Sequence, residues 1–209
     1  LTQGRPKVTD VIGLGRDAAA VLAVAAGVEA GSSHPLAEAV VNRLKEEGVV
    51  SVDLEKFESI TGRGVEATWQ GESYFIGNRK LMEENNIGIS NHLAELVAGL
   101  QSEAKTVVYF ANGNHVLAVI AIADKIKATS AAAIKSLQDK GIEVYMLTGD
   151  NEQTAKAVAK QVGLKHYKAE VLPADKADFV KSLQQHGKIV AMVGDGINDS
   201  HALAQADVS

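Results

Sequence analysis

The second part of the chain alternates between helical patterns that end at glycine and strand-like apolar runs that follow them. These patterns comprise helices at residues 130–140, 151–162 and 174–186, the glycines Gly141, Gly163 and Gly187, and strands at residues 142–147, 167–169 and 188–193. Helices that end at glycine and lead into buried-strand patterns are typical of parallel sheets with helical crossovers. This alternation predicts an α/β, doubly wound domain beginning near residues 121–124.

The first part has a different pattern, with alternating strands joined by tight turns. Two hairpins are predicted, residues 64–69 with 73–76 and residues 106–110 with 115–123, around turns that contain Gly71 and Gly113. Helical stretches lie between and before them, at residues 16–30, 35–47, 79–85 and 91–102. This pattern predicts an α+β unit built on an antiparallel sheet.

Composition narrows the class of protein. Of the 209 residues, 46% are apolar and 22% charged, which is typical of a globular chain. The net charge of −5 argues against a nucleic-acid partner, and the absence of cysteine excludes disulfides and thiolate metal sites. The longest apolar runs, residues 18–28 and 116–123, are shorter than the roughly 20 residues of a membrane helix. Because the first residue is leucine, we expect a piece of a longer protein.

Three polar segments follow or adjoin the predicted parallel strands. They are Thr148-Gly149-Asp150, residues 172–176 with Lys176, and residues 194–199 with Asp195, Asn198 and Asp199. The carboxyl ends of parallel strands share one edge of a sheet, where function gathers. A threonine hydroxyl binds phosphate oxygens, a lysine neutralises their charge, and carboxylates hold Mg²⁺. The three segments together predict a phosphate and magnesium site.

Each segment also has a simpler interpretation. Thr148-Gly149-Asp150 can be a turn that caps the next helix, and Lys176 can be a solvated helix residue. The acids at Asp195 and Asp199 are harder to explain structurally, because the end of a buried strand rarely needs two carboxylates. The order of all three segments at successive strand ends favours the functional interpretation.

The first part contains no phosphate-binding P-loop, so ATP would need another site. His34 precedes Pro35 at a predicted helix start, where the alternative is a helix cap. Gly62 and Gly64 open a strand, and a turn or bulge explains such glycines more often than a ligand does. For Asn78, the alternative to ligand binding is again a helix cap.

The order Thr-Gly-Asp, Pro-x-Asp-Lys and Gly-Asp-Gly-x-Asn-Asp resembles the phosphorylation domain of P-type ATPases, in the haloacid-dehalogenase-like superfamily. The resemblance implies that Thr148 contacts the phosphoryl group, Lys176 neutralises it and Asp195 binds Mg²⁺. Asn198 and Asp199 would support that site. The opening residues Leu1-Thr2 resemble the end of the family's Asp-Lys-Thr-Gly-Thr-Leu-Thr motif, which would place the phosphorylated aspartate just upstream of Leu1.

The order Ser-Ser-His-Pro-Leu, Gly-x-Gly and Gly-Asn-Arg resembles the nucleotide-binding domain of the heavy-metal-transporting members of that family. There the histidine positions adenine, and the other residues line the nucleotide pocket. The corresponding residues here are Glu29, His34, Gly62, Gly64, Gly77 and Asn78.

We therefore expect a nucleotide-binding domain at residues 11–120, inserted into a phosphorylation domain at residues 1–10 and 121–209. The resemblance implies ATP and Mg²⁺ as cofactors, and membrane and actuator domains of the same polypeptide as partners. It also implies a cytoplasmic location beside a membrane whose helices bind the transported ion.

The implied activity is copper export driven by an aspartyl-phosphate intermediate. Residues 116–151 and 193–209 favour copper-type members, whereas Ser33 before the histidine favours zinc and cadmium exporters. His201 stands where many members have proline. Two further alternatives are a soluble phosphatase whose cap is the first part, and a non-catalytic nucleotide sensor.

Overall fold

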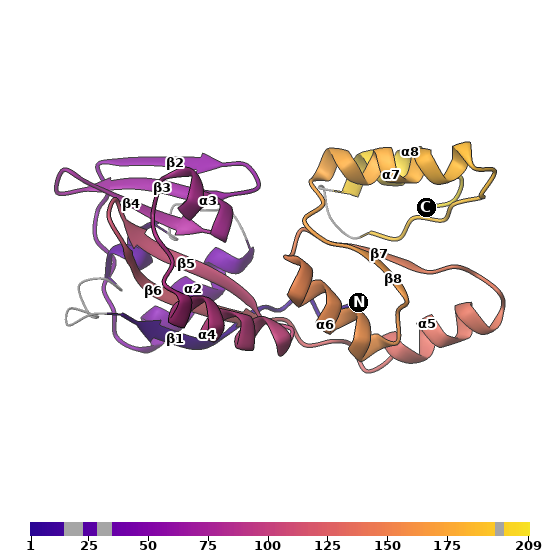
Figure 1. Ribbon diagram of the computed structural model, residues 1–209, viewed down its shortest axis with the longest axis horizontal. Coiled ribbons are helices and arrows are strands. Elements are labelled where there is room, and N and C mark those ends of the chain that lie inside the picture. Colours follow the sequence, from indigo (N-terminus) through magenta and orange to yellow (C-terminus); the bar gives the residue numbers. More distant parts are fainter. Residues whose placement is uncertain (15–22, 29–34, 195–198) are drawn as a thin grey trace.

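The computed structural model describes residues 1–14, 23–28, 35–194 and 199–209. The chain forms two lobes that lie side by side (Figure 1). We call residues 7–14, 23–28 and 35–123 the front lobe, and residues 1–4, 124–194 and 199–209 the back lobe. Among the described helices, none has the length and apolar character needed to cross a bilayer.

A six-stranded antiparallel sheet forms the centre of the front lobe, in the order β1-β6-β5-β4-β3-β2. The strands are β1 (Lys7–Gly13), β2 (Lys56–Ile60), β3 (Gly64–Trp69), β4 (Glu72–Gly77), β5 (Thr106–Asn112) and β6 (Val116–Ala123). Both predicted hairpins are confirmed, since β3 pairs with β4 and β5 pairs with β6. Gln70 and Gly71 have φ values of 51° and 75°, as a tight hairpin turn requires.

Helices cover both faces of this sheet and bury a separate core on each. They are α2 (Pro35–Glu46), α3 (Arg79–Glu84) and α4 (Asn91–Ser102), with a further helical stretch over residues 23–28. The alternation of β5 divides its side chains between the cores: Phe110 joins one cluster and Tyr109 the other, and both are buried. The front lobe is therefore α+β, as its strand and helix patterns predicted.

The back lobe is α/β and contains a parallel pair, β7 with β8. Its elements are α5 (Ser130–Asp139), β7 (Tyr145–Leu147), α6 (Glu152–Val162), β8 (His166–Lys168), α7 (Pro173–Gln185) and α8 (Ser200–Gln205). The predicted helices are confirmed to within about two residues at their ends. Gly163 ends α6 in the left-handed conformation, with φ 73°.

The strand predicted at residues 188–193 is not part of this sheet. Ala191 makes one isolated bridge to Val208, and the side chains of Ile189 and Val193 are 87% and 92% exposed. A strand requires hydrogen-bonded neighbours on the sheet as well as an apolar run, and the described residues supply only the short segment at Val208. The apolar pattern indicated a strand, but it carried no information on which strand would pair with it.

The chain passes between the lobes twice, in two segments that lie side by side, one before β1 and one after β6 (Figure 1). At the back lobe, Gln3 N–H donates to Lys125 O at 2.9 Å. At the front lobe, β1 pairs with β6 from Lys7 opposite Ala123 onward. Strand β1 was not predicted, and it runs across residues 10 and 11, where the sequence pattern placed a boundary.

Candidate functional site

The loop Thr148-Gly149-Asp150 leaves the end of β7 and leads into α6. Its backbone is held by Thr148 N–H donating to Lys168 O at 3.0 Å and by Glu170 N–H donating to Asp150 O at 2.8 Å. The Thr148 hydroxyl donates to Asp150 Oδ2 at 2.8 Å and accepts from the Asp150 N–H at 3.1 Å. The two polar side chains of the loop therefore form a local pair at the carboxyl end of β7.

Lys176 and Asp199 form an ion pair in the back lobe. Lys176 lies in the first turn of α7, and Asp199 immediately precedes α8. The distance from Lys176 Nζ to Asp199 Oδ1 is 2.6 Å, and each side chain is only 15% exposed. Lys176 is thus not the solvated helix residue of the simpler interpretation. The tertiary structure brings together two residues that the sequence had separately assigned to phosphate and metal binding.

The remaining predicted ligands of the acidic loop, Asp195 and Asn198, lie outside the described residues. Gly194, which precedes them, is close to Asp199: a Cβ on Gly194 would lie 2.8 Å from Asp199 Oδ2. Within the ranges that the structure describes, no group of three His, Asp or Glu side chains is arranged to hold a metal ion. Carboxylates at a tight glycine turn are oxygen donors of the kind Mg²⁺ prefers, so the residue types fit that ion.

In the front lobe, Gly64 and Gly77 face each other across β3 and β4. Gly64 has φ 146°, and a Cβ there would lie 2.1 Å from Ile76 O. A Cβ on Gly77 would lie 2.3 Å from Arg63 O. The close approach of the two backbones therefore requires glycine at both positions, whatever ligand the surface binds.

Asn78 caps α3, as the simpler interpretation of this residue expected. Its Oδ1 accepts from the Leu81 N–H at 3.1 Å, and its Nδ2 donates to Gly62 O at 2.8 Å. The cap thereby fixes the turn that carries Gly62, whose φ is 70°. The other predicted nucleotide-binding residues, Glu29 and His34, lie outside the described residues, just ahead of the start of α2 at Pro35.

The sequence analysis did not identify a charged cluster where the lobes meet. Lys105 Nζ lies 2.9 Å from Asp10 Oδ2 and 2.7 Å from Glu103 Oε2. Hydrogen bonds from the Thr9 hydroxyl and then from Lys105 lower the pKa of Asp10 below its usual value. Hydrogen bonds to Glu103 and to Asp10 raise the pKa of Lys105. No local signal in the sequence pairs Asp10 with Lys105, which lie 95 positions apart.

Two hydrogen bonds connect this cluster to the back lobe. The buried Thr154 hydroxyl, in α6, donates to Lys105 O at 2.8 Å. The hydroxyl of Thr106, the first residue of β5, donates to Asp150 Oδ1 at 2.7 Å. The loop Thr148-Gly149-Asp150 is thus tied to the front lobe through Asp150.

Comparison with known proteins agrees with this arrangement. The model of the haloacid dehalogenase-like hydrolase family matches residues 1–207. A copper-exporting P-type ATPase of Staphylococcus aureus (strain Newman) is 44% identical over 208 residues, which are 100% of this chain and 25% of that protein. A copper-exporting P-type ATPase of Staphylococcus epidermidis (strain ATCC 12228 / FDA PCI 1200) is 45% identical over 100% of this chain and 26% of that protein. The chain therefore spans about a quarter of the length of these relatives.

Solved structures give the same assignment. The catalytic domain of the CPx-ATPase CopB-B, described for its conformational changes upon nucleotide binding, superposes with a TM-score of 0.78. It is 30% identical, and the match covers 100% of this chain and 72% of that one. A zinc-transporting PIB-type ATPase in its E2.Pi state gives a TM-score of 0.58 at 37% identity, over 99% of this chain and 33% of that one. The chain therefore belongs to the haloacid dehalogenase-like hydrolase family and, within it, to the heavy-metal P-type ATPases.

Proposed function

We propose that this chain is the ATP-binding and phosphoryl-transfer region of a pump that exports copper. The observation that carries the proposal is the Lys176–Asp199 pair, only 15% exposed on each side, in the lobe that presents the Thr148 hydroxyl at the end of β7. Lysine, a hydroxyl and a carboxylate loop suit the stabilisation of a phosphoryl group in transfer. Copper as the cargo is supported by the names of the two staphylococcal relatives, and a zinc or cadmium exporter is the alternative.

In this proposal ATP binds the front lobe beside His34 and Glu29, along the turn with Gly62 and Gly64. The acceptor aspartate belongs to the intact protein upstream of Leu1, in the motif that residues 1 and 2 resemble. Asp195 would hold Mg²⁺, with Asp199 and Asn198 in support, and the bound ion would supply positive charge for the phosphoryl oxygens. Thr148 donates a hydrogen bond to the phosphoryl group, and Lys176 supplies a fixed positive charge beside it.

The exposed apolar side chains of Ile189 and Val193 support the placement of a further strand there. We propose that a segment of the intact protein outside residues 1–209 adds to the β-type segment 188–193 and covers both side chains. The same segment would bring the acceptor aspartate to the carboxyl edge of the sheet, next to Thr148 and Lys176. The remaining partners in the proposal are the membrane and actuator domains of the same polypeptide.

Calorimetry with ATP tests the nucleotide site on this chain. We expect His34→Ala to weaken ATP binding by about tenfold or more, because a stacked and hydrogen-bonded imidazole is worth a typical 1–3 kcal/mol. His92→Ala is the matched control, since His92 is an exposed residue of α4. Equal ATP affinities of the two variants would indicate that His34 caps the helix and does not bind the nucleotide.

Phosphorylation by labelled ATP tests the catalytic part. The intact protein is expected to form an acid-stable phosphoenzyme that requires Mg²⁺ and the transported metal, whereas residues 1–209 alone are expected to form none. A phosphoenzyme on residues 1–209 would show that the acceptor is misplaced. An intact protein that binds ATP without being phosphorylated would support the nucleotide-sensor alternative.

A further inference from the structure

The carboxylate of Asp150 joins the two lobes through its two oxygens. Oδ1 accepts from the hydroxyl of Thr106, at the start of β5, at 2.7 Å. Oδ2 accepts from the hydroxyl of Thr148, at the end of β7, at 2.8 Å. All three residues are partly buried, so water competes poorly for these bonds. One side chain thus connects the front lobe to the residue proposed to bind phosphate.

The Thr148 hydroxyl has a single hydrogen, and in this arrangement Asp150 accepts it. Its oxygen also accepts from the Asp150 N–H at 3.1 Å. The hydroxyl can therefore donate to a phosphoryl oxygen only if its bond to Asp150 Oδ2 is released. The position of the Asp150 carboxylate decides how readily that happens.

The backbone around these side chains is fixed on both lobes. In the back lobe, Thr148 is bonded on both sides, through its N–H to Lys168 O and through its carbonyl to the Val171 N–H, each at 3.0 Å. In the front lobe, Thr106 lies opposite Ile122 in the sheet. The variable parts of the connection are therefore the side-chain torsions, and the Thr106 hydroxyl restricts those of Asp150.

We propose that Thr106 is a positioning residue for phosphoryl transfer, acting through Asp150 on the orientation of the Thr148 hydroxyl. The hydrogen bond from the Thr106 hydroxyl draws on the negative charge of the Asp150 carboxylate, so the carboxylate accepts less strongly from Thr148. The same hydrogen bond keeps the Asp150 side chain in one rotamer. A movement of the front lobe that breaks the Thr106 bond would leave Thr148 as the remaining side-chain donor to Asp150. The phosphate-binding hydroxyl would thus respond to the placement of the lobes. This inference rests on the proposed function.

The test is the rate of phosphoenzyme formation in the intact protein carrying Thr106→Val. We expect a loss of about tenfold, the typical effect of one hydrogen bond to a charged group, with the affinity for ATP unchanged. Thr106→Ser keeps the hydroxyl and should restore the rate to within about twofold. Thr68→Val is the control for a β-branched substitution in the same sheet, at a partly exposed position in β3 whose side chain makes no hydrogen bond to any residue that the structure describes.

A double-variant cycle shows whether Thr106 acts through Asp150. In an Asp150→Asn background, Thr106→Val should cost little further rate, because the carboxylate it positions is gone. Additive losses, or an unchanged rate in Thr106→Val alone, would overturn the inference. Absence of a phosphoenzyme in the unmodified intact protein would instead overturn the proposed function, so the two failures are distinguishable. Thermal unfolding of residues 1–209 with Thr106→Val checks that the fold is retained.

Discussion

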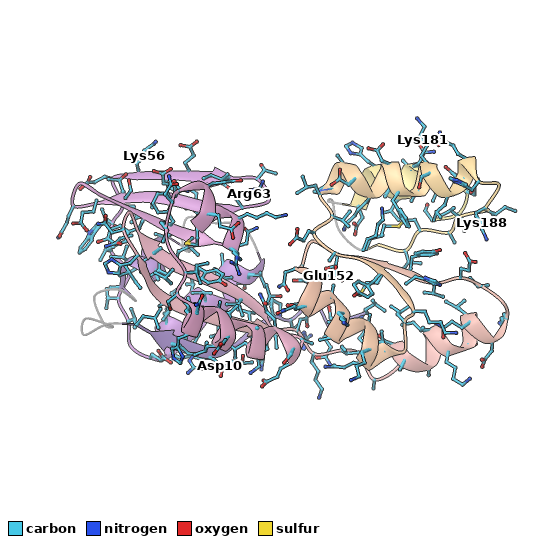
Figure 2. The ribbon with its side chains drawn as sticks, in the orientation of Figure 1. Asp10, Lys56, Arg63, Glu152, Lys181 and Lys188 are labelled. Atoms are coloured by element: carbon cyan, nitrogen blue, oxygen red, sulfur yellow. The ribbon has the colours of Figure 1, made fainter. Side chains whose placement is uncertain are left out.

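Gly62 of the front lobe lies directly against Leu172 of the back lobe, so that a Cβ on Gly62 would come within 2.7 Å of Leu172 Cδ2. Lys80 and Glu170 form an ion pair between the same two lobes. The neighbouring Arg63 lies on the side of the front lobe that faces the back lobe (Figure 2). Gly62, one of the glycines expected to line a nucleotide pocket, therefore makes a contact between the lobes.

Gly62→Ala is expected to loosen this contact. The φ of 70° disfavours any side chain there, and the new Cβ collides with Leu172. Gly71→Ala is a matched control, because Gly71 has φ 75° and nothing within 4 Å of its Cβ position. We expect Gly71→Ala to cost about 1 kcal/mol of unfolding free energy and to leave the lobes in place.

The measurement is the distance between spin labels placed on the two lobes. It should lengthen or broaden in Gly62→Ala alone, and Leu172→Ala in the same chain should restore it by removing the colliding methyl group. An unchanged distance distribution in Gly62→Ala would show that the contact does not determine the lobe arrangement.

Lys176→Met is expected to destabilise the back lobe by about 1.5–3 kcal/mol, because it leaves the Asp199 carboxylate poorly solvated and without its charged donor. Lys181→Met is the control, since Lys181 is an exposed residue of the same helix and lies on its outer side (Figure 2). Urea unfolding of both variants measures the difference. Equal losses would mean that the ion pair contributes nothing measurable to stability.

The Asp10–Lys105 pair predicts a dependence of stability on pH. The pKa of Asp10 is lowered in the folded chain, so its contribution is present above its unfolded value and is lost as the pH falls through the lowered pKa. The raised pKa of Lys105 means that its contribution holds below its unfolded value and is lost as the pH rises through the raised one. Both contributions are therefore present at pH 7.

Asp10→Asn is accordingly expected to lower the unfolding free energy at pH 7 by up to about 1 kcal/mol, and by progressively less below about pH 4. Asp139→Asn is the control, because Asp139 pairs with Lys135 at 3.0 Å through side chains that are 63% and 74% exposed. Chemical unfolding at pH 7 and at pH 3.5 provides the comparison. A loss that is the same at both pH values would argue against the ionic origin.

Ile189→Thr and Val193→Thr test the proposed covering strand. In residues 1–209 each change should alter the unfolding free energy by less than about 0.5 kcal/mol, because both side chains are exposed. Val180→Thr, at a position 2% exposed, should cost about 1–3 kcal/mol and serves as the buried contrast. In the intact protein, by contrast, the changes at Ile189 and Val193 should destabilise, because the added strand would bury both side chains. Backbone amides of residues 189–193 that exchange equally fast in both proteins would rule out the added strand.

Local chemistry made much of the fold predictable from the sequence. The helix ends at Gly141, Gly163 and Gly187 follow from the left-handed conformation that glycine accepts at low cost, with φ values of 79°, 73° and 75°. The hairpin turn at Gln70 and Gly71 follows from the same property. The polar segments after β7 and at α7 were recognisable because their residue types suit phosphate and magnesium. These features depend on neighbours in the chain, and neighbours are visible in a sequence.

The tertiary structure alone decided which distant residues meet. Strand β1 has no strong apolar alternation and is defined by pairing with β6. Lys176 meets Asp199 across 23 positions, and Thr106 meets Asp150 across 44. Such contacts form only after loops have closed and both lobes have packed, so residue order cannot specify their partners. The sequence by itself determined the described helices and both hairpins and predicted a chemistry for the motifs, whereas packing determined the ion pair and the connection between the lobes.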